Sequence, residues 1–264
     1  MKNLFSLEGR VALVTGGSRG IGEMIAEGFV RAGAKVYISA RKASACEETA
    51  KRLSAFGQCV AIPADASGAS GAQNLAKLYL AMESRLDILV NNAGAAWGAE
   101  MEGFPESGWD KVMDLNVKAP FFLVQALLGA LRAGASAERP AKVINIASID
   151  GLSVNMQPTY SYAASKAGLI HLTRRLALEL APQNIVVSAI APGAFASNMN
   201  KVARDHGDAL ARQIPARRIG TPEDMAGAAI FLASRAGDYV VGGVLAVDGG
   251  VAWTRQGLGW TEDS

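Results

Sequence analysis

The chain has 264 residues, of which 50% are hydrophobic and 19% charged, as is ordinary for a water-soluble protein with a sizeable core. Its 26 basic and 24 acidic residues are scattered and give a formal net charge of +2, which argues against a nucleic-acid or membrane-surface partner. Cys46, Cys59 and two histidines show no metal-ligand spacing, so we expect no metal site. No run approaches the ~18 apolar residues of a membrane span, and the expected location is cytoplasmic.

Short apolar runs alternate with longer amphipathic stretches along the chain. The expected strands are 11–15, 35–39, 59–64, 86–91, 141–148, 185–191 and 245–248. The expected helices are 21–32, 45–56, 71–85, 108–132, 162–180 and 222–234. This alternation predicts an α/β fold: a doubly wound Rossmann sheet of about seven parallel strands with helices on both faces. We expect a single domain over residues 1–264, with a core from about 7 to 250 and a tail over 251–264.

The first expected strand ends in a glycine-rich turn. Gly16, Gly20 and Gly22 follow the apolar run 11–14 with the spacing G-x-x-x-G-x-G. Glycines permit a tight turn, and a helix that begins near Gly20 directs its unpaired N–H groups at an anion. A sharp turn without a ligand is the alternative. The spacing differs from the G-x-G-x-x-G of the long-known dehydrogenases, and we interpret it as a site for a dinucleotide pyrophosphate.

The end of the second strand decides between the two nicotinamide dinucleotides. An acidic residue about 20 positions after the first glycine normally binds the ribose hydroxyls, but this chain has Ser39-Ala40-Arg41-Lys42 there. Arg41, together with Arg19 in the glycine turn, offers planar donors suited to a 2′-phosphate. The pair favours NADP(H) over NAD(H), whereas either arginine alone is equally consistent with a solvated surface charge. Asp65, which Ala66 follows, is either an adenine ligand or a helix cap.

A tyrosine and a lysine mark the expected catalytic helix. Tyr162 and Lys166 lie four residues apart and share one helix face. An ammonium group near a phenol lowers the pKa of the phenol, as a general acid or base requires. Ser148 ends a strand at the carboxyl edge of the sheet, where its hydroxyl can contact a reacting carbonyl. The alternatives are an ordinary amphipathic helix and a serine that caps a turn.

Together these motifs resemble the short-chain dehydrogenase/reductase family, in its classical branch. The matching residues keep the family's order and spacing from about residue 7 to residue 250: Thr15 to Gly22, Asp65, Asn91 to Gly94, Asn116, Ser148, Tyr162, Lys166, Pro192-Gly193 and Val247 to Gly250. The resemblance implies a Rossmann fold and an NADP(H)-dependent oxidoreductase that transfers hydride between the nicotinamide and a carbonyl or secondary alcohol.

The resemblance also implies a catalytic tetrad. Tyr162 would be the general acid, Lys166 would lower its pKa and bind the nicotinamide ribose, Ser148 would orient the carbonyl, and Asn116 would hold a water that supplies protons through Lys166. The implied cofactor contacts are Gly16, Ser18, Arg19, Gly20, Ile21, Gly22, Ser39, Arg41, Asp65, Ala66, Asn92, Ala93, Gly94, Tyr162, Lys166, Pro192, Gly193, Phe195 and Ser197. Ser197 stands where many members have Thr, and its hydroxyl can still bond a carboxamide.

Within the family the chain is similar to 3-oxoacyl thioester reductases of the rhamnolipid-pathway type, through Ser18-Arg19, Gly108-Trp109 and the loop 136–140. The expected substrate walls are mostly apolar, which suits a ketone or an acyl chain. They are Trp97, Ile149, Asp150, Met156, Phe195 and Met199. Trp97 and Phe195 are equally suited to the core. The alternatives are an enzyme acting on another small ketone or alcohol, and a non-catalytic dinucleotide-binding regulator.

The resemblance further implies a homotetramer, or a dimer, assembled through the helices that contain Asn116 and Tyr162 and through the last strand. The tail 251–264 includes Trp253 and Trp260. We expect this tail to cover a substrate site, either its own or that of a neighbouring subunit.

Overall fold

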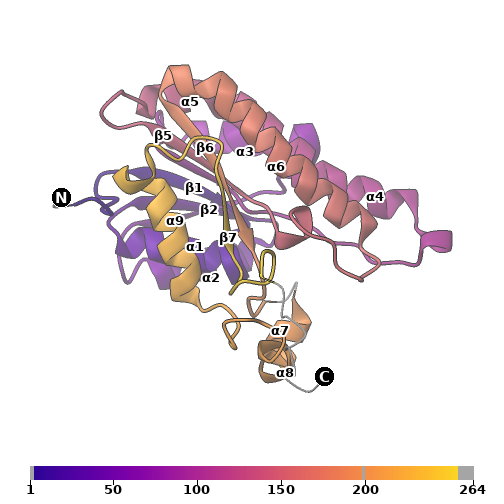
Figure 1. Ribbon diagram of the computed structural model, residues 1–264. Coiled ribbons are helices and arrows are strands. Elements are labelled where there is room, and N and C mark those ends of the chain that lie inside the picture. The colour runs from indigo at the N-terminus through magenta and orange to yellow at the C-terminus, as the bar shows by residue number, and fades with distance from the viewer. Residues whose placement is uncertain (1–2, 198–199, 255–264) are drawn as a thin grey trace.

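A seven-stranded parallel sheet forms the centre of the computed structural model, which describes residues 3–197 and 200–254. The strand order is β3-β2-β1-β4-β5-β6-β7 (Figure 1). The order reverses at β1, which lies between β2 and β4, and ligands bind at such switch points beyond the carboxyl ends of the strands. The strands are β1 (Val11–Thr15), β2 (Lys35–Ala40), β3 (Cys59–Pro63), β4 (Ile88–Asn91), β5 (Ala141–Ile146), β6 (Ile185–Pro192) and β7 (Val244–Val247). The expected doubly wound parallel sheet is confirmed.

The central strands are buried along their whole length. Every residue of β1, β4, β5 and β6 is buried. Strands covered on both faces contain continuous apolar runs instead of an alternating pattern. For this reason the apolar runs of the sequence predict all seven strands to within two residues at each end.

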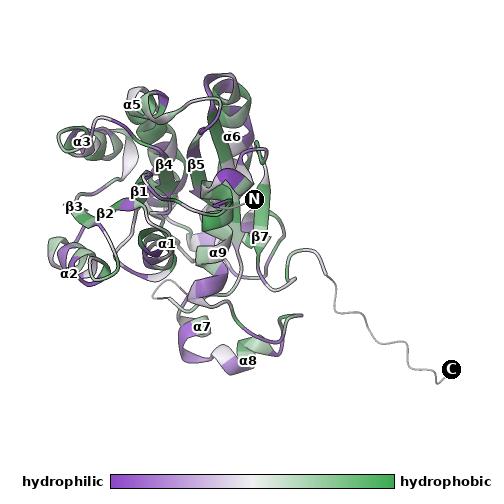
Figure 2. Cartoon of the chain, turned by 90° about the vertical axis from the view of Figure 1, so that its left-hand side faces the viewer, coloured by the Kyte–Doolittle hydropathy of each residue, from purple (hydrophilic) through white to green (hydrophobic). Residues whose placement is uncertain are grey.

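Helices cover both faces of the sheet (Figure 2). One core cluster joins α1, α2 and α9 to the sheet, and the other joins α3, α5 and α6 to it. The helices are α1 (Gly20–Arg31), α2 (Ala43–Leu53), α3 (Gly68–Leu80), α4 (Glu106–Met113), α5 (Ala119–Gly134), α6 (Tyr160–Leu180), α7 (Lys201–Asp205), α8 (Gly207–Ala211) and α9 (Pro222–Ala233). The short α7 and α8 lie in the long connection between β6 and α9, beyond the carboxyl edge of the sheet (Figure 1).

The helix expected over 108–132 is divided in the structure. A π-helical turn, Asp114–Lys118, separates α4 from α5. Pro120, in the first turn of α5, has no N–H to donate to the carbonyl of Asn116, and its ring crowds that carbonyl. The hydrogen-bond ladder therefore changes at this point, and such turns often occur at functional sites.

The helices pack as core elements. In the described part of the chain, no single helix is long and apolar enough to cross a membrane; one bent pair, 106–126 with 128–134, meets that requirement. Leu123 and Leu131 of this pair are buried against the sheet.

Only the beginning of the tail is described. Residues 251–254 follow the last strand, and the side chain of Trp253 is 68% exposed. Most of the tail predicted to cover a substrate site, including Trp260, lies outside the described residues.

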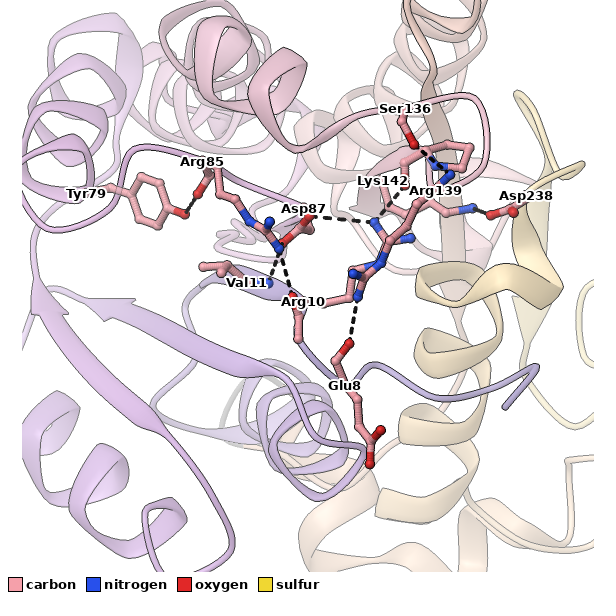
Figure 3. A network of polar contacts seen from close by, with 12 residues as sticks. Glu8, Arg10, Val11, Tyr79, Arg85, Asp87, Ser136, Arg139, Lys142 and Asp238 are labelled. Carbon is pink, nitrogen blue, oxygen red and sulfur yellow. Dashed lines mark hydrogen bonds and ion pairs between the residues drawn. The ribbon is translucent and has the colours of Figure 1, made fainter. Parts of the chain in front are cut away.

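The amino ends of the strands meet in a buried polar network (Figure 3). The Asp87 carboxylate, just before β4, accepts a hydrogen bond from the backbone N–H of Val11 at 2.7 Å, and it lies 3.8 Å from the Arg10 guanidinium. Lys142 of β5 pairs with Asp238 at 2.6 Å. Burial lowers the pKa of Lys142, and Asp238 acts in the opposite direction. The network joins distant segments at the sheet edge opposite the expected ligand site.

Candidate active site

The glycine-rich turn forms a cradle of exposed backbone between β1 and α1. Gly16 and Gly20 have φ angles of +66° and +55°, a region that favours glycine. A Cβ atom at Gly22 would lie 2.3 Å from the Gly16 carbonyl oxygen and 2.4 Å from the Asn92 amide nitrogen. Side chains would therefore fill the turn at the N-terminus of α1. Such a cradle fits the pyrophosphate of a dinucleotide.

Thr15 and Asn92 fix the cradle to the neighbouring strand. The Thr15 hydroxyl accepts hydrogen bonds from the backbone N–H groups of Asn92 and Ala93, both at 2.9 Å. The Asn92 side chain donates to the carbonyls of Thr15 at 2.8 Å and Gly16 at 3.2 Å. From the sequence, Thr15 is only the first residue of the motif. The signals for its structural role are a hydroxyl at the end of one strand and the Asn91-Asn92 pair at the end of another.

The two arginines predicted to select NADP(H) lie at the ends of adjacent strands. Arg19 immediately precedes α1, and Arg41 immediately follows β2; both are exposed. Within the described ranges, no ion pair or hydrogen bond engages either guanidinium. The backbone N–H of Gly17 donates to the carbonyl of the buried Ser39 at 3.1 Å, which holds the end of β2 against the turn. Ser18 lies in the same turn and accepts a hydrogen bond through its carbonyl.

Asp65 bonds within the turn before α3, and the cap residue of that helix is Ser67. One oxygen of its carboxylate accepts hydrogen bonds from the backbone N–H of Ser67 at 3.0 Å and from the Ser67 hydroxyl at 2.7 Å. Ser67 immediately precedes α3, so Asp65 organises the start of that helix. Ala66 is buried in the core on that face of the sheet.

Three residues of the predicted tetrad come together beyond β5. A hydrogen bond links the side chains of Tyr162 and Ser148. The Lys166 ammonium is buried, lies 5.5 Å from the centroid of the Tyr162 ring, and donates to the carbonyl of Ile146 at 2.7 Å. A Cβ at Gly94 would lie 3.7 Å from the Lys166 nitrogen, so the loop after β4 also approaches this site. A hydroxyl, a phenol and an ammonium group thus share one buried site.

Burial dominates the acid–base properties of the pair. It raises the pKa of Tyr162 to about 12, while the hydrogen bond with Ser148 acts to lower it and the negative charge of Asp150 to raise it. Burial lowers the pKa of Lys166 to about 8, against the opposing effect of Asp150. The direction for Tyr162 is opposite to the one that the Tyr–Lys spacing predicts. Desolvation disfavours both the phenolate and the ammonium ion.

Asn116 lies in the π-helical turn and uses its side chain to fix the loop after β4. Its amide oxygen accepts from the backbone N–H of Ala95 at 2.8 Å, and its amide nitrogen donates to the Ala95 carbonyl and the Ser165 hydroxyl, both at 2.9 Å. Ser165 is adjacent to Lys166 in α6. Asn116 therefore ties the loop to the catalytic helix.

The segment after β6 approaches the glycine cradle. A Cβ at Gly193, which follows Pro192, would lie 2.7 Å from the Cα of Asp248. A Cβ at Gly20 would lie 3.2 Å from the Cβ of Ser197, so Ser197 faces the turn. The Ser197 hydroxyl accepts a hydrogen bond from the next turn of the chain. These positions agree with a segment that covers a ligand on the cradle.

The residues of the expected substrate walls differ widely in exposure. Ile149 and Asp150 follow Ser148 and are half-buried. Trp97 is half-buried against Gly108, where a Cβ would lie 2.7 Å from the indole ring. The side chain of Met156 is fully exposed.

Phe195 and Met199 complete the expected walls. Phe195 takes the core alternative: it is 2% exposed, and its ring packs on Gly220. Met199 lies outside the described residues. Burial of Phe195 depends on a contact with a residue far along the chain, which the local sequence does not reveal.

An apolar cavity of about 320 Å³ lies between the loop after β4, α4 and the first turn of α6. Its lining residues are Met101, Phe104, Pro105, Glu106, Trp109 and Tyr160. The Phe104 ring meets Tyr160 and Trp109 edge-on, with centroid distances of 5.7 and 6.3 Å. The sequence does not predict this cavity, because Tyr160 is far along the chain from the segment 101–109 that supplies the other lining residues.

A series of hydrogen bonds between buried polar side chains lies beneath the site. The Asn91 side chain donates to Asn145 at 2.8 Å, and Asn145 donates to the Thr173 hydroxyl at 2.9 Å. All three residues are buried. They connect β4, β5 and α6, and so hold the strand ends beneath the catalytic helix.

Comparisons with known proteins agree with this geometry. A family model described as enoyl-(acyl carrier protein) reductase matches residues 16–252. A crystal structure of a short-chain type dehydrogenase/reductase from Mycobacterium marinum superimposes with a TM-score of 0.87 and 31% identity, over 95% of this chain and 98% of the other. The chain belongs to the short-chain dehydrogenase/reductase family. As a member of this family it is an oxidoreductase.

Among its relatives in the family, the chain is 53% identical to the rhamnolipids biosynthesis 3-oxoacyl-[acyl-carrier-protein] reductase of Pseudomonas aeruginosa, over 95% of this chain and 99% of that protein. The structure is similar to that of the Pseudomonas aeruginosa RhlG/NADP active-site complex, with a TM-score of 0.92 and 52% identity over 96% and 100% of the two chains. A 2-dehydro-3-deoxy-D-gluconate 5-dehydrogenase from Dickeya dadantii is 39% identical over 94% of this chain and 97% of its own.

Proposed function

We propose that the protein is an NADPH-dependent reductase of 3-oxoacyl thioesters or similarly apolar ketones. The observation that carries this proposal is the Ser148–Tyr162 hydroxyl pair with the buried Lys166 behind it, on the same sheet edge as the glycine cradle. Bound NADPH supplies the hydride. The residues of the chain position the carbonyl and deliver the proton.

Tyr162 donates its proton to the carbonyl oxygen of the bound substrate. Its raised pKa keeps the phenol protonated at neutral pH, the form that a general acid needs. Ser148 donates a hydrogen bond to the same oxygen and so stabilises the charge that develops there. Lys166, with a pKa of about 8, can return a proton toward Tyr162, while Asn116 maintains the loop that shapes the site.

The cofactor is NADP(H). Arg19 and Arg41 extend into solvent beside the cradle, and their guanidinium groups are suited to a 2′-phosphate. The RhlG/NADP complex, which covers 96% of this chain, supports the same cofactor. Asp65 follows β3 on the adenosine side of the site, and one of its carboxylate oxygens already accepts hydrogen bonds from Ser67.

Two observations support the proposed substrate class. They are the apolar residues near the site and the 53% identity to the 3-oxoacyl-[acyl-carrier-protein] reductase of Pseudomonas aeruginosa. The apolar cavity at the start of α6, lined in part by Tyr160, offers apolar surface on the helix that carries Tyr162, which suits a substrate with an acyl chain. A sugar-acid ketone is the second candidate, because a 39% identical relative is a gluconate-type dehydrogenase. The hydrogen-bonded Ser148–Tyr162 pair favours catalysis over a regulatory role that would need only cofactor binding.

Replacing Tyr162 with Phe tests the catalytic assignment. The substitution removes the proton donor and keeps the aromatic ring, so we expect turnover to fall by at least about 100-fold. NADPH affinity, measured by the fluorescence of the bound cofactor, should stay within about threefold of the wild type. A variant that reduces the substrate at the wild-type rate would refute the assignment.

The protein assembles as a homotetramer, or as a dimer, in the cytoplasm, where NADPH is available. Phe121 of α5 and Leu178 of α6 are 38% and 73% exposed, which supports a partner subunit against these helices. Light scattering on the purified protein distinguishes the assemblies, and a strictly monomeric mass would contradict this part of the proposal.

A further inference from the structure

A carboxylate stands next to the catalytic serine. Asp150 lies in a single 3₁₀ turn, Ile149–Gly151, directly after Ser148. The Ser148 hydroxyl oxygen accepts a hydrogen bond from the backbone N–H of Asp150 at 3.1 Å. The serine thus caps the turn and fixes the backbone that carries Asp150 two residues after it.

The turn is held tightly against the catalytic helix. A Cβ at Gly151 would lie 2.6 Å from the carbonyl carbon of Lys166 and 2.8 Å from the backbone nitrogen of Ala167. These atoms belong to the helix backbone and cannot move aside. The glycine permits this approach, and as a result the position of Asp150 is fixed relative to both Tyr162 and Lys166.

No hydrogen bond or close ion pair holds the charge of Asp150 among the described residues. Its side chain is half-buried. The buried Asp87, by contrast, is paired with arginine. The field of Asp150 reaches the reacting groups, because its negative charge acts to raise the pKa of both Tyr162 and Lys166. A carboxylate fixed at this place therefore acts electrostatically on whatever binds at the serine.

We propose that Asp150 is a charge filter that favours neutral ketones and excludes ketones with a carboxylate close to the reacting carbonyl. The inference depends on reduction at Ser148 and Tyr162, but not on the thioester itself. Like charges separated by a few ångströms in a partly desolvated site repel each other strongly. The two substrate classes among the relatives differ in charge, because a 3-oxoacyl thioester is neutral near the carbonyl, whereas a 5-keto-gluconate is an acid whose carboxylate lies further along the chain from the reacting carbonyl.

The experiment compares a matched pair of 3-oxo compounds, ethyl acetoacetate and acetoacetate, as substrates with NADPH. The ratio of kcat/KM for ester over acid is measured in the wild type, Asp150→Asn, Asp150→Glu and Glu179→Gln. Glu179 is 13 residues beyond Lys166 on α6, or about 20 Å away, and serves as a control for the loss of one negative charge. If either compound is not reduced, both are measured as inhibitors against an accepted ketone, and the ratio of 1/Ki for ester over acid replaces the ratio of kcat/KM.

We expect the wild type to favour the ester and Asp150→Asn to reduce this preference by about tenfold or more. Asp150→Glu should restore the preference, and Glu179→Gln should leave it unchanged. An ester-to-acid ratio in Asp150→Asn within twofold of the wild type would overturn the proposal. Failure of the 3-oxoacyl proposal has a different signature: no turnover of any 3-oxoacyl thioester, whatever the ratio for the small ketones.

The pH dependence gives a second readout that a purely structural role would not move. Among the described residues, Asp150 is the charged group that acts on the pKa of both Tyr162 and Lys166. The neighbouring Ser148 and Asn116 are neutral. Without the Asp150 charge the pKa of Tyr162 falls, and the protonated phenol is lost at lower pH. The alkaline limb of kcat/KM for the ester should therefore move to lower pH in Asp150→Asn, but not in Asp150→Glu.

Discussion

Replacing Asp87 with Ala removes the centre of the polar network at the amino edge of the sheet (Figure 3). Asp87 is 1% exposed and Arg10 is 4% exposed, so the substitution leaves a buried cation without its carboxylate. Breaking such a pair costs about 3–5 kcal/mol. The Val11 N–H also loses its acceptor, whereas the contribution of Arg85 is small because its side chain is 43% exposed. We expect a loss of about 4 kcal/mol in the free energy of unfolding.

This loss corresponds to a decrease of about 10 °C in Tm, measured by circular dichroism, for a chain of this size. The five residues of β1 separate the network from the glycine cradle by about 16 Å, so NADPH affinity at 20 °C should stay within about threefold. Asp87→Asn is the matched control, since it keeps an acceptor for Val11 and should lose less stability than the alanine variant. A decrease of less than about 1 kcal/mol in Asp87→Ala would refute the view that the network stabilises the fold.

Two substitutions test the cofactor site. Gly22→Ala places a methyl group 2.3 Å from the Gly16 carbonyl oxygen, so NADPH affinity by fluorescence titration should fall by at least about 100-fold; retained affinity would show that the turn is not the pyrophosphate site. Arg41→Ala removes an exposed guanidinium, worth about 1.5–3 kcal/mol against a phosphate, and should weaken NADPH binding by about 10- to 100-fold with NADH binding unchanged. An equal loss for both cofactors would contradict the 2′-phosphate assignment.

The sequence contains most of the information on the scaffold, because buried parallel strands and glycine turns have local signatures. The seven apolar runs and the spacing of Gly16, Gly20 and Gly22 predict the sheet, its order of elements and the cradle. The division of the helix at Asn116 had a local signal as well, in Pro120, but an amphipathic pattern over 108–132 outweighed it.

Properties that depend on tertiary burial were not predictable. The spacing of Tyr162 and Lys166 predicts a lowered phenol pKa, but desolvation by the surrounding helices raises it. Phe195 packs on Gly220, a contact that joins two ends of a long connection. In the same way, the network around Asp87 joins segments that are far apart in sequence. In the sequence alone, its members are charged residues beside strands, with no sign that they contact one another.

The proposed NADPH-dependent reduction of 3-oxoacyl thioesters is tested by the initial rate of cofactor oxidation with a short 3-oxoacyl thioester, measured separately with NADPH and with NADH. We expect turnover of the thioester with a kcat/KM for NADPH at least about tenfold above that for NADH, because one or two charge-assisted contacts to the 2′-phosphate have this effect. Equal rates with the two cofactors would contradict the role of Arg19 and Arg41, and reduction only of other ketones would contradict the 3-oxoacyl substrate.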